Sequence, residues 1–387
     1  MLCLGLAPVT ARAAAQPALI VVDAQTGSVL KEAAATHRWH PASLTKLMTI
    51  FLALDAVVDG RLSMNEALPI SAAAANQSEF KLGLQVGKTI RVREAILAVL
   101  QRSANDAAAL LAERVAGTES AFAERMTAKA KALGMAGTQF RNATGLPDPA
   151  QITTARDMAV LARAILERFP QYADLFATAG FTYDGQSWPT INGLLTSYPG
   201  AEAVKTGFTC DSGYNIVASA KRGGRRLIAV VLGGHSKGER NALAANLLSA
   251  GFASSATPAR SVADLAEAVE APPHVLAPSE CVASSGSSSG PAGGGSSWVM
   301  LLGTFASEPQ ARAAIDSAKL RMARATRAGS PVVTQRAREG ARGYTAAIGG
   351  LTRPQASTAC KQLWESDVFC RPLLRTQLAS EKTRRKT

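Results

Sequence analysis

Residues 214–232 read YNIVASAKRGGRRLIAVVL, and this stretch decides the fold of the longer part of the chain. Two runs of β-branched and aliphatic residues flank Gly223-Gly224, a pair that favours a tight turn. Such a pattern predicts an antiparallel β-hairpin. A second hairpin is expected near the N-terminus, where residues 19–23 and 28–30 flank a turn-like segment. Strands are therefore predicted at both ends of one unit.

Helices are predicted between these hairpins. The run 44–58 repeats apolar residues at helical spacing after Pro41, and the Ala- and Leu-rich segments 91–133 and 155–168 are also helical in pattern. A further helix is expected at 240–248, after the second hairpin. When terminal segments meet in one sheet and the middle is helical, the fold class is α+β with a separate helical lobe.

The composition restricts the partners of the chain more than its activity. The 387 residues suffice for two or three domains, 47% of them are hydrophobic, and only 5% are aromatic. The formal charge of +13 suits nucleic acid, an anionic membrane surface or an anionic cell-wall polymer, and plain solubility explains it equally well. No segment is long and apolar enough to span a bilayer.

The order of segments along the chain suggests export followed by two folded units. Residues 1–15 contain a short apolar run and small residues typical of a signal peptide, without its positively charged start. Residues 284–297 are almost entirely Ser and Gly, and this composition predicts a flexible connection. The predicted division is a signal peptide truncated at its start (1–15), a larger domain (16–257), a Pro/Ser/Gly linker (258–297), a small domain (298–372) and a basic tail (373–387).

The cysteines bear on the compartment of the protein. Four of them follow the predicted signal peptide, without a CxxC pair or a zinc-site spacing, so no metal and no cofactor is expected. Cys360 and Cys370 are close enough in sequence for a local disulfide in an oxidising compartment. Two buried free thiols are an almost equal alternative.

Three Ser-x-x-Lys spacings occur, and their contexts differ. A serine is activated best when the lysine lies one helical turn away and the serine is at a helix N-terminus. Ser43 and Lys46, which open the predicted helix after Pro41, meet both conditions. Ser28–Lys31 lies in a strand, and Ser78–Lys81 lies in a polar stretch. On spacing alone, an N-cap serine beside a surface lysine is the better interpretation of Ser43.

Two further motifs change that interpretation. Ser103-x-Asn105 ends a helical run, and Lys205-Thr206-Gly207 is predicted to open the first strand of the late hairpin. A glycine there lets a substrate backbone approach, and the lysine can pair with a carboxylate. Alone, each motif also suits a helix end or an edge strand. In this order and on these elements, the three motifs are the set found in class A β-lactamases and penicillin-binding proteins.

The residues around these motifs resemble the low-molecular-weight serine D-alanyl-D-alanine carboxypeptidases, peptidase family S11, over residues 18–255. The resemblance implies a DD-peptidase/β-lactamase-like fold, with an antiparallel sheet flanked by helices and a helical lobe. It also implies acylation by penicillins and removal of the terminal D-Ala from peptidoglycan pentapeptide stems through an acyl-enzyme. The segments that carry it are RWHPASLTKLMT (38–49), SANDA (103–107), FRNATGLP (140–147) and KTGFT (205–209).

The resemblance implies a role for each motif residue. Ser43 would attack the carbonyl between the two D-Ala residues, and Lys46 would accept its proton, which requires a lowered pKa at Lys46. Ser103 would relay protons. Asn105 would hydrogen-bond the substrate and help to place the base. Lys205, Thr206 and Thr209 would bind the substrate's free carboxylate, and Gly207 would give it access. The backbone N–H groups of Ser43 and Phe208 would form an oxyanion hole.

Three other activities remain open on the sequence. A class A β-lactamase carries a glutamate in a loop between the second and third motifs, whereas the one glutamate between 142 and 199, Glu167, lies in a helical run and disfavours that activity. A D,D-endopeptidase would use the same site on cross-links. A non-catalytic peptidoglycan-binding protein would keep only the fold. Histidine-based zinc catalysis is disfavoured, because HRWH at 37–40 lacks the necessary glutamate.

The second unit opens with the strand-like segment 298–305 and carries the sequence GLTRPQA at 350–356, before its last predicted helix. In these features it resembles a SPOR (sporulation-related repeat) domain. It implies a small ferredoxin-like βαββαβ fold that binds peptidoglycan glycan strands. The residue pattern predicts strands at 298–305, 344–348 and 367–370 and helices at 308–320 and 354–363.

Together the two resemblances imply a periplasmic or secreted protein associated with the cell wall. Its implied partners are stem peptides ending in D-Ala-D-Ala, β-lactam antibiotics and, through the second unit, glycan strands. Nucleic acid is not among the expected partners, although the net charge alone would suit it.

Overall fold

The computed structural model describes residues 16–78, 80–254, 260–266, 298–305, 307–322, 329–338, 341–364, 368 and 370–375. The chain divides into two compact units between Ser287 and Ser288. The predicted signal peptide, most of the predicted linker and residues 376–387 of the predicted basic tail lie outside the described residues, whereas the start of that tail belongs to a strand that ends at Leu374.

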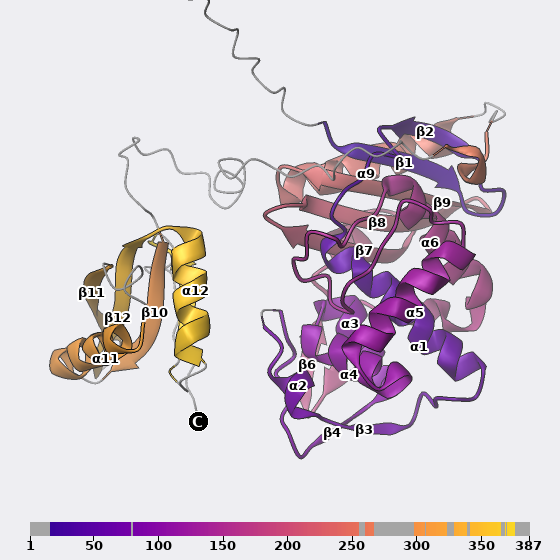
Figure 1. The fold of residues 1–387 in the computed structure, drawn as a ribbon. Coiled ribbons are helices and arrows are strands. Elements are labelled where there is room, and N and C mark those ends of the chain that lie inside the picture. The colour runs from indigo at the N-terminus through magenta and orange to yellow at the C-terminus, as the bar shows by residue number, and fades with distance from the viewer. Residues whose placement is uncertain are drawn as a thin grey trace, which may run out of the picture. The chain divides into compact units, whose positions relative to one another are not determined.

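A five-stranded antiparallel sheet forms the centre of the first unit (Figure 1). Its strands are β1 (Ala18–Asp23), β2 (Val29–Ala33), β7 (Ala201–Thr209), β8 (Gly213–Arg222) and β9 (Arg225–Gly234), in the spatial order β2-β1-β9-β8-β7. The two predicted hairpins are confirmed. They join along β1 and β9, where Ile20 lies opposite Val230. This pairing brings the two ends of the unit together and leaves β7 at an edge.

Alternate residues of the sheet enter two different cores, as the period of a strand requires. Val21 and Val231 pack beneath α9 (Lys237–Ala253) on one face. Ile20 and Val230 pack on the opposite face, against α6 (Ala155–Arg168) and the helices beyond it. Because both faces are covered, the central strands are apolar along almost their whole length.

The helical lobe lies between the two hairpins in sequence and below the sheet in Figure 1. At its centre is α1 (Lys46–Val58), whose residues from Lys46 to Ala56 are all buried, as in a helix surrounded by other helices. The elements around α1 are η1 (Ala42–Thr45), β3 (Ala67–Pro69), α2 (Ala72–Ala75), β4 (Thr89–Arg91), α3 (Val92–Arg102), α4 (Asn105–Ala116) and α5 (Glu119–Ala132). The segment from α6 to β7 adds η2 (Pro170–Tyr172), α7 (Ala173–Ala177), β5 (Gly180–Tyr183), β6 (Gln186–Pro189) and α8 (Gly193–Ser197).

Several boundaries differ from the sequence-based expectations. The helices predicted within 91–133 are α3, α4 and α5, separated where Ser103 adopts a left-handed conformation and Gly117 caps α4. The helix predicted at 240–248 runs from Lys237 to Ala253. Residues 260–266, expected in the linker, pack on the first unit: Val29 N donates to Arg260 O at 2.9 Å. Apolar Val262 is buried there, in η3 (Val262–Asp264), which explains why this segment docks.

The second unit is a four-stranded antiparallel sheet of order β11-β12-β10-β13 with two helices. Its elements are β10 (Trp298–Phe305), α11 (Glu308–Leu320), β11 (Ser330–Arg338), β12 (Ala341–Leu351), α12 (Arg353–Trp364) and β13 (Arg371–Leu374). The element order is the βαββαβ order that the resemblance implied. The residue pattern did not predict β11, and it placed the last strand at 367–370, before the observed β13.

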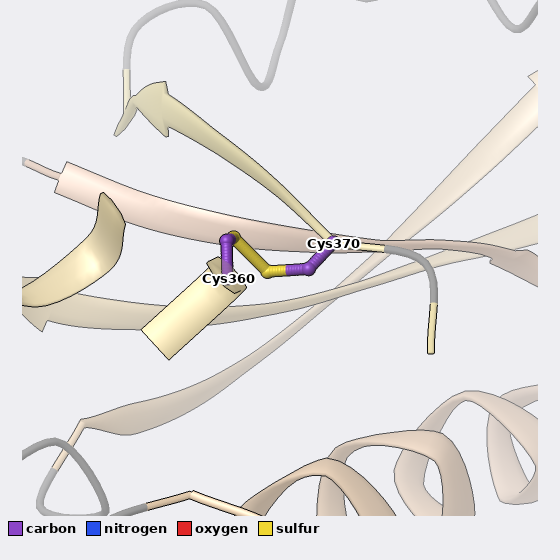
Figure 2. The surroundings of a disulfide bond; sticks show 2 residues. All are labelled: Cys360 and Cys370. Carbon is purple, nitrogen blue, oxygen red and sulfur yellow. A yellow bond between two sulfur atoms is a disulfide. The ribbon is translucent and has the colours of Figure 1, made fainter. Parts of the chain in front are cut away.

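A disulfide joins Cys360 on α12 to Cys370 at the start of β13 (Figure 2). Their Cα atoms are 5.1 Å apart, and both residues are buried in the core of the second unit. Of the two alternatives open on the sequence, the structure therefore has the bonded pair. The disulfide fixes β13 to the helix that precedes it.

Removing this disulfide should destabilise the second unit. Closing a loop with a sequence separation of 10 constrains the unfolded chain, and its loss should cost about 2.5 kcal/mol of unfolding free energy. We expect the full chain carrying Cys360→Ala and Cys370→Ala to be cleaved in this unit at lower urea in pulse proteolysis. The wild type with reductant is the matched comparison. An unchanged urea midpoint in both samples would contradict the prediction.

Candidate active site

Ser43 lies on η1, a turn of 3-10 helix directly before α1. Its Oγ is 3.1 Å from Nζ of Lys46, the first residue of α1. The Lys46 ammonium also donates to Thr144 O. The pair selected from the sequence is therefore in direct contact, at a helix N-terminus where backbone N–H groups favour negative charge.

Burial controls the protonation of Lys46. Its side chain is completely buried, and desolvation lowers its pKa well below the ordinary value of 10.5. The nearby ammonium of Lys205 lowers this pKa further, whereas the carboxylates of Asp106 and Glu119 raise it. A lysine with such a lowered pKa can accept a proton from Ser43, as general-base catalysis requires.

Two glycines let the backbone close tightly around Ser43. A Cβ on Gly145 would lie 2.0 Å from Ala42 O, and the φ of Gly145, +81°, also favours glycine. A Cβ on Gly207 would lie 2.9 Å from Ser43 N. Ala42 itself has a φ of +49°, an uncommon conformation for a residue with a side chain. Any side chain at residue 207 would therefore obstruct the backbone N–H of the serine.

The Ser103 and Asn105 motif forms a second wall of the site. Ser103 ends α3 in a left-handed conformation with a φ of +58°, and its Oγ accepts from Lys205 Nζ at 3.0 Å. Asn105 is the first residue of α4, and its Nδ2 donates to Ser78 O at 2.8 Å. The predicted contact of Asn105 with the base remains a prediction.

Edge strand β7 forms the third wall. Lys205 is buried, and desolvation, followed by the charge of Arg240, lowers its pKa to about 7. Thr206 Oγ1 donates to Asn192 Oδ1 at 3.0 Å. Thr209 and Ser212 share hydrogen bonds at the turn after β7, and Phe208 stacks on Tyr214 with 4.2 Å between ring centroids. The structure thus brings Ser43 against Lys46 and Gly207, and Ser103 against Lys205.

The sequence interpretation missed several buried polar residues around the site. Asn215 Nδ2 donates to His40 O at 2.9 Å and to Pro41 O at 3.1 Å, which fixes the backbone that leads to Ser43. The Asp106 carboxylate accepts from the backbone N–H groups of residues 82–84 at distances from 2.8 to 3.0 Å. The one sequence signal for Asp106 was its position directly after the motif residue Asn105. No sequence pattern marked Asn215 as part of the site.

Arg240 is the missed residue with the clearest chemical meaning. It lies on α9 with 6% of its surface exposed, and burial lowers its pKa to about 10. Its guanidinium donates to Asn241 Oδ1 at 2.9 and 3.0 Å. Among the residues that the structure describes, neither Arg240 nor Lys205 has a carboxylate partner in an ion pair. Two buried cations without an anion indicate a site for an anionic ligand.

No group of three or more His, Cys, Asp or Glu residues able to hold a metal ion occurs within the described ranges. Glu167, considered on the sequence as a possible water-activating residue, lies exposed near the end of α6. The nearest acidic residues that act on Lys46 are instead Asp106 and Glu119.

The fold and this arrangement of serine, lysines and edge strand define a DD-peptidase-like protein. The chain belongs to the D-alanyl-D-alanine carboxypeptidase family, peptidase S11, whose model matches residues 7–236. Among curated relatives, DacF of Bacillus subtilis is 35% identical over 242 residues, covering 60% of this chain and 61% of the relative. DacC of Escherichia coli is also 35% identical, covering 61% of this chain and 60% of the relative.

Solved structures give the same result. A D-alanyl-D-alanine carboxypeptidase DacD from Francisella tularensis matches with a TM-score of 0.59 at 30% identity, covering 65% of this chain and 74% of that one. Penicillin-binding protein D2 of Listeria monocytogenes, solved with bound cefotaxime, matches with a TM-score of 0.57 at 33% identity, covering 61% and 96%. The chain spans about three fifths of the length of the curated relatives named above. Within the described residues, every helix is too short or too polar to cross a membrane.

Proposed function

We propose that this protein is a serine D-Ala-D-Ala carboxypeptidase that removes the terminal D-Ala from peptidoglycan pentapeptide stems. The observation that carries the proposal is the contact between Ser43 Oγ and the fully buried Lys46 Nζ. Family membership supports the reaction type, and the buried cations Lys205 and Arg240 support a substrate with a free carboxylate.

Acylation begins when Ser43 Oγ attacks the carbonyl carbon between the two D-Ala residues. Lys46 takes the hydroxyl proton as the oxygen–carbon bond forms, and the carbonyl oxygen becomes an oxyanion. The backbone N–H groups of Ser43 and Phe208 would stabilise that charge, and the close approach of Gly207 to Ser43 supports this placement. When the carbon–nitrogen bond breaks, the proton passes from Lys46, by way of Ser103, to the leaving amine.

Deacylation repeats the chemistry with water as the nucleophile. Lys46, neutral again, accepts a proton from water, and the hydroxide oxygen attacks the ester carbon of the acyl-enzyme. Collapse of the tetrahedral intermediate returns the proton to Ser43 Oγ and releases the shortened stem. A penicillin would acylate Ser43 in the same way, and its slow hydrolysis would leave a long-lived adduct.

The terminal carboxylate of the substrate would lie near Lys205 and Arg240. Lys205 donates to Ser103 Oγ at 3.0 Å and to Thr206 O at 2.8 Å, so it joins the carboxylate site to the proton relay. Arg240 contributes a second positive charge from α9. Thr209 completes the set inferred from the family motif. This arrangement favours a carboxypeptidase, since the leaving D-Ala carries the carboxylate.

Replacing Arg240 tests the carboxylate site. We expect Arg240→Gln to raise KM for a D-Ala-D-Ala peptide by roughly 10- to 100-fold, because a charge-assisted hydrogen bond of about 1.5–3 kcal/mol is lost. Removal of this cation should also raise the pKa of Lys205 above about 7, so the alkaline limb of kcat/KM should move to higher pH. Lys237→Gln, an exposed charge on the same helix, should change neither quantity. An unchanged KM in Arg240→Gln would show that Arg240 does not bind the substrate's carboxylate.

The proposed function is tested by two assays on the full chain. One follows adduct formation with a labelled penicillin, and the other follows D-Ala release from a D-Ala-D-Ala peptide. A long-lived adduct with D-Ala release supports the carboxypeptidase. Rapid loss of penicillin without D-Ala release would indicate a β-lactamase, and binding to wall sacculi without either reaction would indicate a non-catalytic protein. Assay of a cross-linked dimer peptide separates endopeptidase from carboxypeptidase activity.

The second unit suits attachment to the cell wall. Its βαββαβ element order supports the SPOR resemblance, and through it the binding of glycan strands. Its disulfide suits an oxidising compartment such as the periplasm or the exterior of the cell. We therefore extend the proposal to a periplasmic or secreted enzyme that is associated with the wall.

A further inference from the structure

We infer that Asn192 is a positioning residue that joins the C-terminal turn of α3 to the Lys-Thr-Gly strand and fixes the direction of the Thr206 hydroxyl. This inference deepens the proposed function and rests on it. Asn192 has no assigned role in the reaction, and it lies between β6 and α8 rather than in any of the three motifs.

The side-chain amide of Asn192 connects two walls of the active site. Its Nδ2 donates to Leu100 O at 3.2 Å, and its Oδ1 accepts from Thr206 Oγ1 at 3.0 Å. The residue has 1% of its surface exposed, so water does not compete for these bonds. One buried amide thus links the helix that ends in Ser103 with the strand that carries Lys205.

The end of α3 explains why an amide is needed at this position. The last carbonyl groups of a helix have no partner within it. Because Ser103 adopts a left-handed conformation, the helix stops there, and segment 191–192 supplies the missing donors. Ile191 N donates to Gln101 O at 3.0 Å, and Asn192 Nδ2 satisfies Leu100 O. A carbonyl left unpaired in this buried turn would be costly.

This arrangement also decides the orientation of the amide. The NH2 group of Asn192 must face Leu100 O, so its oxygen must face Thr206. Thr206 is then the donor in its bond to Asn192, and only its lone pairs remain for other partners. In the resting site Thr206 cannot donate to a substrate carboxylate without giving up Asn192. Lys205 and Arg240 therefore receive the carboxylate first.

The same link fixes the spacing on which the proton relay depends. The 3.0 Å contact between Lys205 Nζ and Ser103 Oγ joins one residue on β7 to another at the end of α3. Asn192 lies beside this contact and holds neighbours of both residues, Thr206 and Leu100. Asn192 touches no reacting atom, so its effect acts through these partners.

The test is a double-mutant cycle on the full chain. Asn192→Leu removes both hydrogen bonds at similar size, and Thr206→Val removes the hydroxyl. We expect each to lower kcat about tenfold per active site, since a buried polar group left unpaired costs about 1–3 kcal/mol. The double variant should lose no more than Asn192→Leu alone, because both changes break the bond between Asn192 and Thr206. Active sites are counted with labelled penicillin, which removes loss of folded protein from the comparison.

Two further variants separate positioning from general packing. Asn192→Asp keeps the acceptor for Thr206 but loses the donor to Leu100 O, so its kcat should lie between those of the wild type and Asn192→Leu. Gln101→Leu removes the buried amide that donates to Leu175 O at 3.1 Å, in the same helical turn but away from Thr206. This control should lower thermal stability while kcat per site stays within about twofold.

The outcomes that overturn the inference are distinct from those that overturn the proposed function. A wild type that neither forms an adduct nor releases D-Ala would overturn the proposed function. An active wild type with kcat unchanged in Asn192→Leu would overturn the inference alone. Losses that multiply to about a hundredfold in the double variant, or an Asn192→Asp as poor as Asn192→Leu, would show that the bond to Thr206 is not what matters.

Discussion

Ser43→Ala is expected to abolish both the penicillin adduct and D-Ala release, with kcat lowered by roughly 10⁴-fold or more. The substitution removes the nucleophilic oxygen itself. The proposed base, Lys46, contacts Ser43 Oγ at 3.1 Å and would have no hydroxyl to deprotonate. Adduct formation is read by mass spectrometry of the intact chain, and release is read by assay of free D-Ala. Since alanine removes only one half-buried hydroxyl, the fold should persist.

Ser28→Ala is the matched control for this substitution. Ser28 and Lys31 have the same spacing as the proposed catalytic pair, but Ser28 lies beside β2, where it bonds with Thr26 at 2.8 Å. This variant should retain the adduct and full D-Ala release. Persistence of both reactions in Ser43→Ala, at any rate near that of Ser28→Ala, would show that the nucleophile is another residue.

Lys46→Met should be the second most severe substitution, with kcat/KM lowered by about 10²- to 10⁴-fold, the usual contribution of a general base. Methionine matches the apolar stem of lysine, so the core around α1 should remain packed. Lys31→Met, an exposed lysine on β2, is the control and should leave kcat/KM unchanged. A Lys46→Met variant with near-normal acylation would transfer the role of base to another group, such as Ser103 with Lys205.

The same lysine predicts two dependences on pH. In the wild type, kcat/KM should fall as pH drops through the lowered pKa of Lys46, because protonated Lys46 cannot accept the serine proton. The unfolding free energy should rise with pH, whereas a salt-bridged lysine, whose pKa is raised in the folded state, would make it fall. Unfolded Lys46 holds its proton up to about pH 10.4, whereas folded Lys46 releases it at lower pH, so unfolding free energy rises with pH across that interval.

Urea unfolding at several pH values checks the second dependence. The rise in unfolding free energy between neutral and alkaline pH should be smaller in Lys46→Met than in the wild type. Lys205, whose pKa is lowered to about 7, should contribute a rise of the same sign that remains in the variant. Equal slopes in the two proteins would indicate that Lys46 is protonated in the folded state.

The sequence predicted the parts of the fold that depend on local pattern. Runs of β-branched and aliphatic residues around a turn segment located both main hairpins, and apolar periodicity located α1 and α6. It missed β11 and the small hairpins β3–β4 and β5–β6, because short or polar strands are decided by what they pack against. Residues 260–266 look like linker by composition, and only the docked position of Val262 explains their order.

The proposed catalytic residues stand in local motifs for a similar reason, whereas the residues packed around them do not. Ser43, Lys46, Ser103 and Lys205 stand in short motifs whose spacing reflects one helical turn or one strand. Arg240, Asn192 and Asn215 come from elements far apart in sequence, and each is placed by buried hydrogen bonds. Such contacts follow from tertiary packing, which leaves no periodic signature in the chain.

The pairing of β1 with β9 has a consequence for the order of events when the chain is made. β1 (Ala18–Asp23) emerges early, but its neighbour in the centre of the sheet, β9 (Arg225–Gly234), emerges only after the whole helical lobe. Contacts so distant in sequence form slowly. Until they form, the edge strand with Lys205 has no fixed place beside Ser43. Ser43 and Lys46 are neighbours on one local segment, but the cation Lys205 takes its place beside Ser103 only when the two ends of the unit meet.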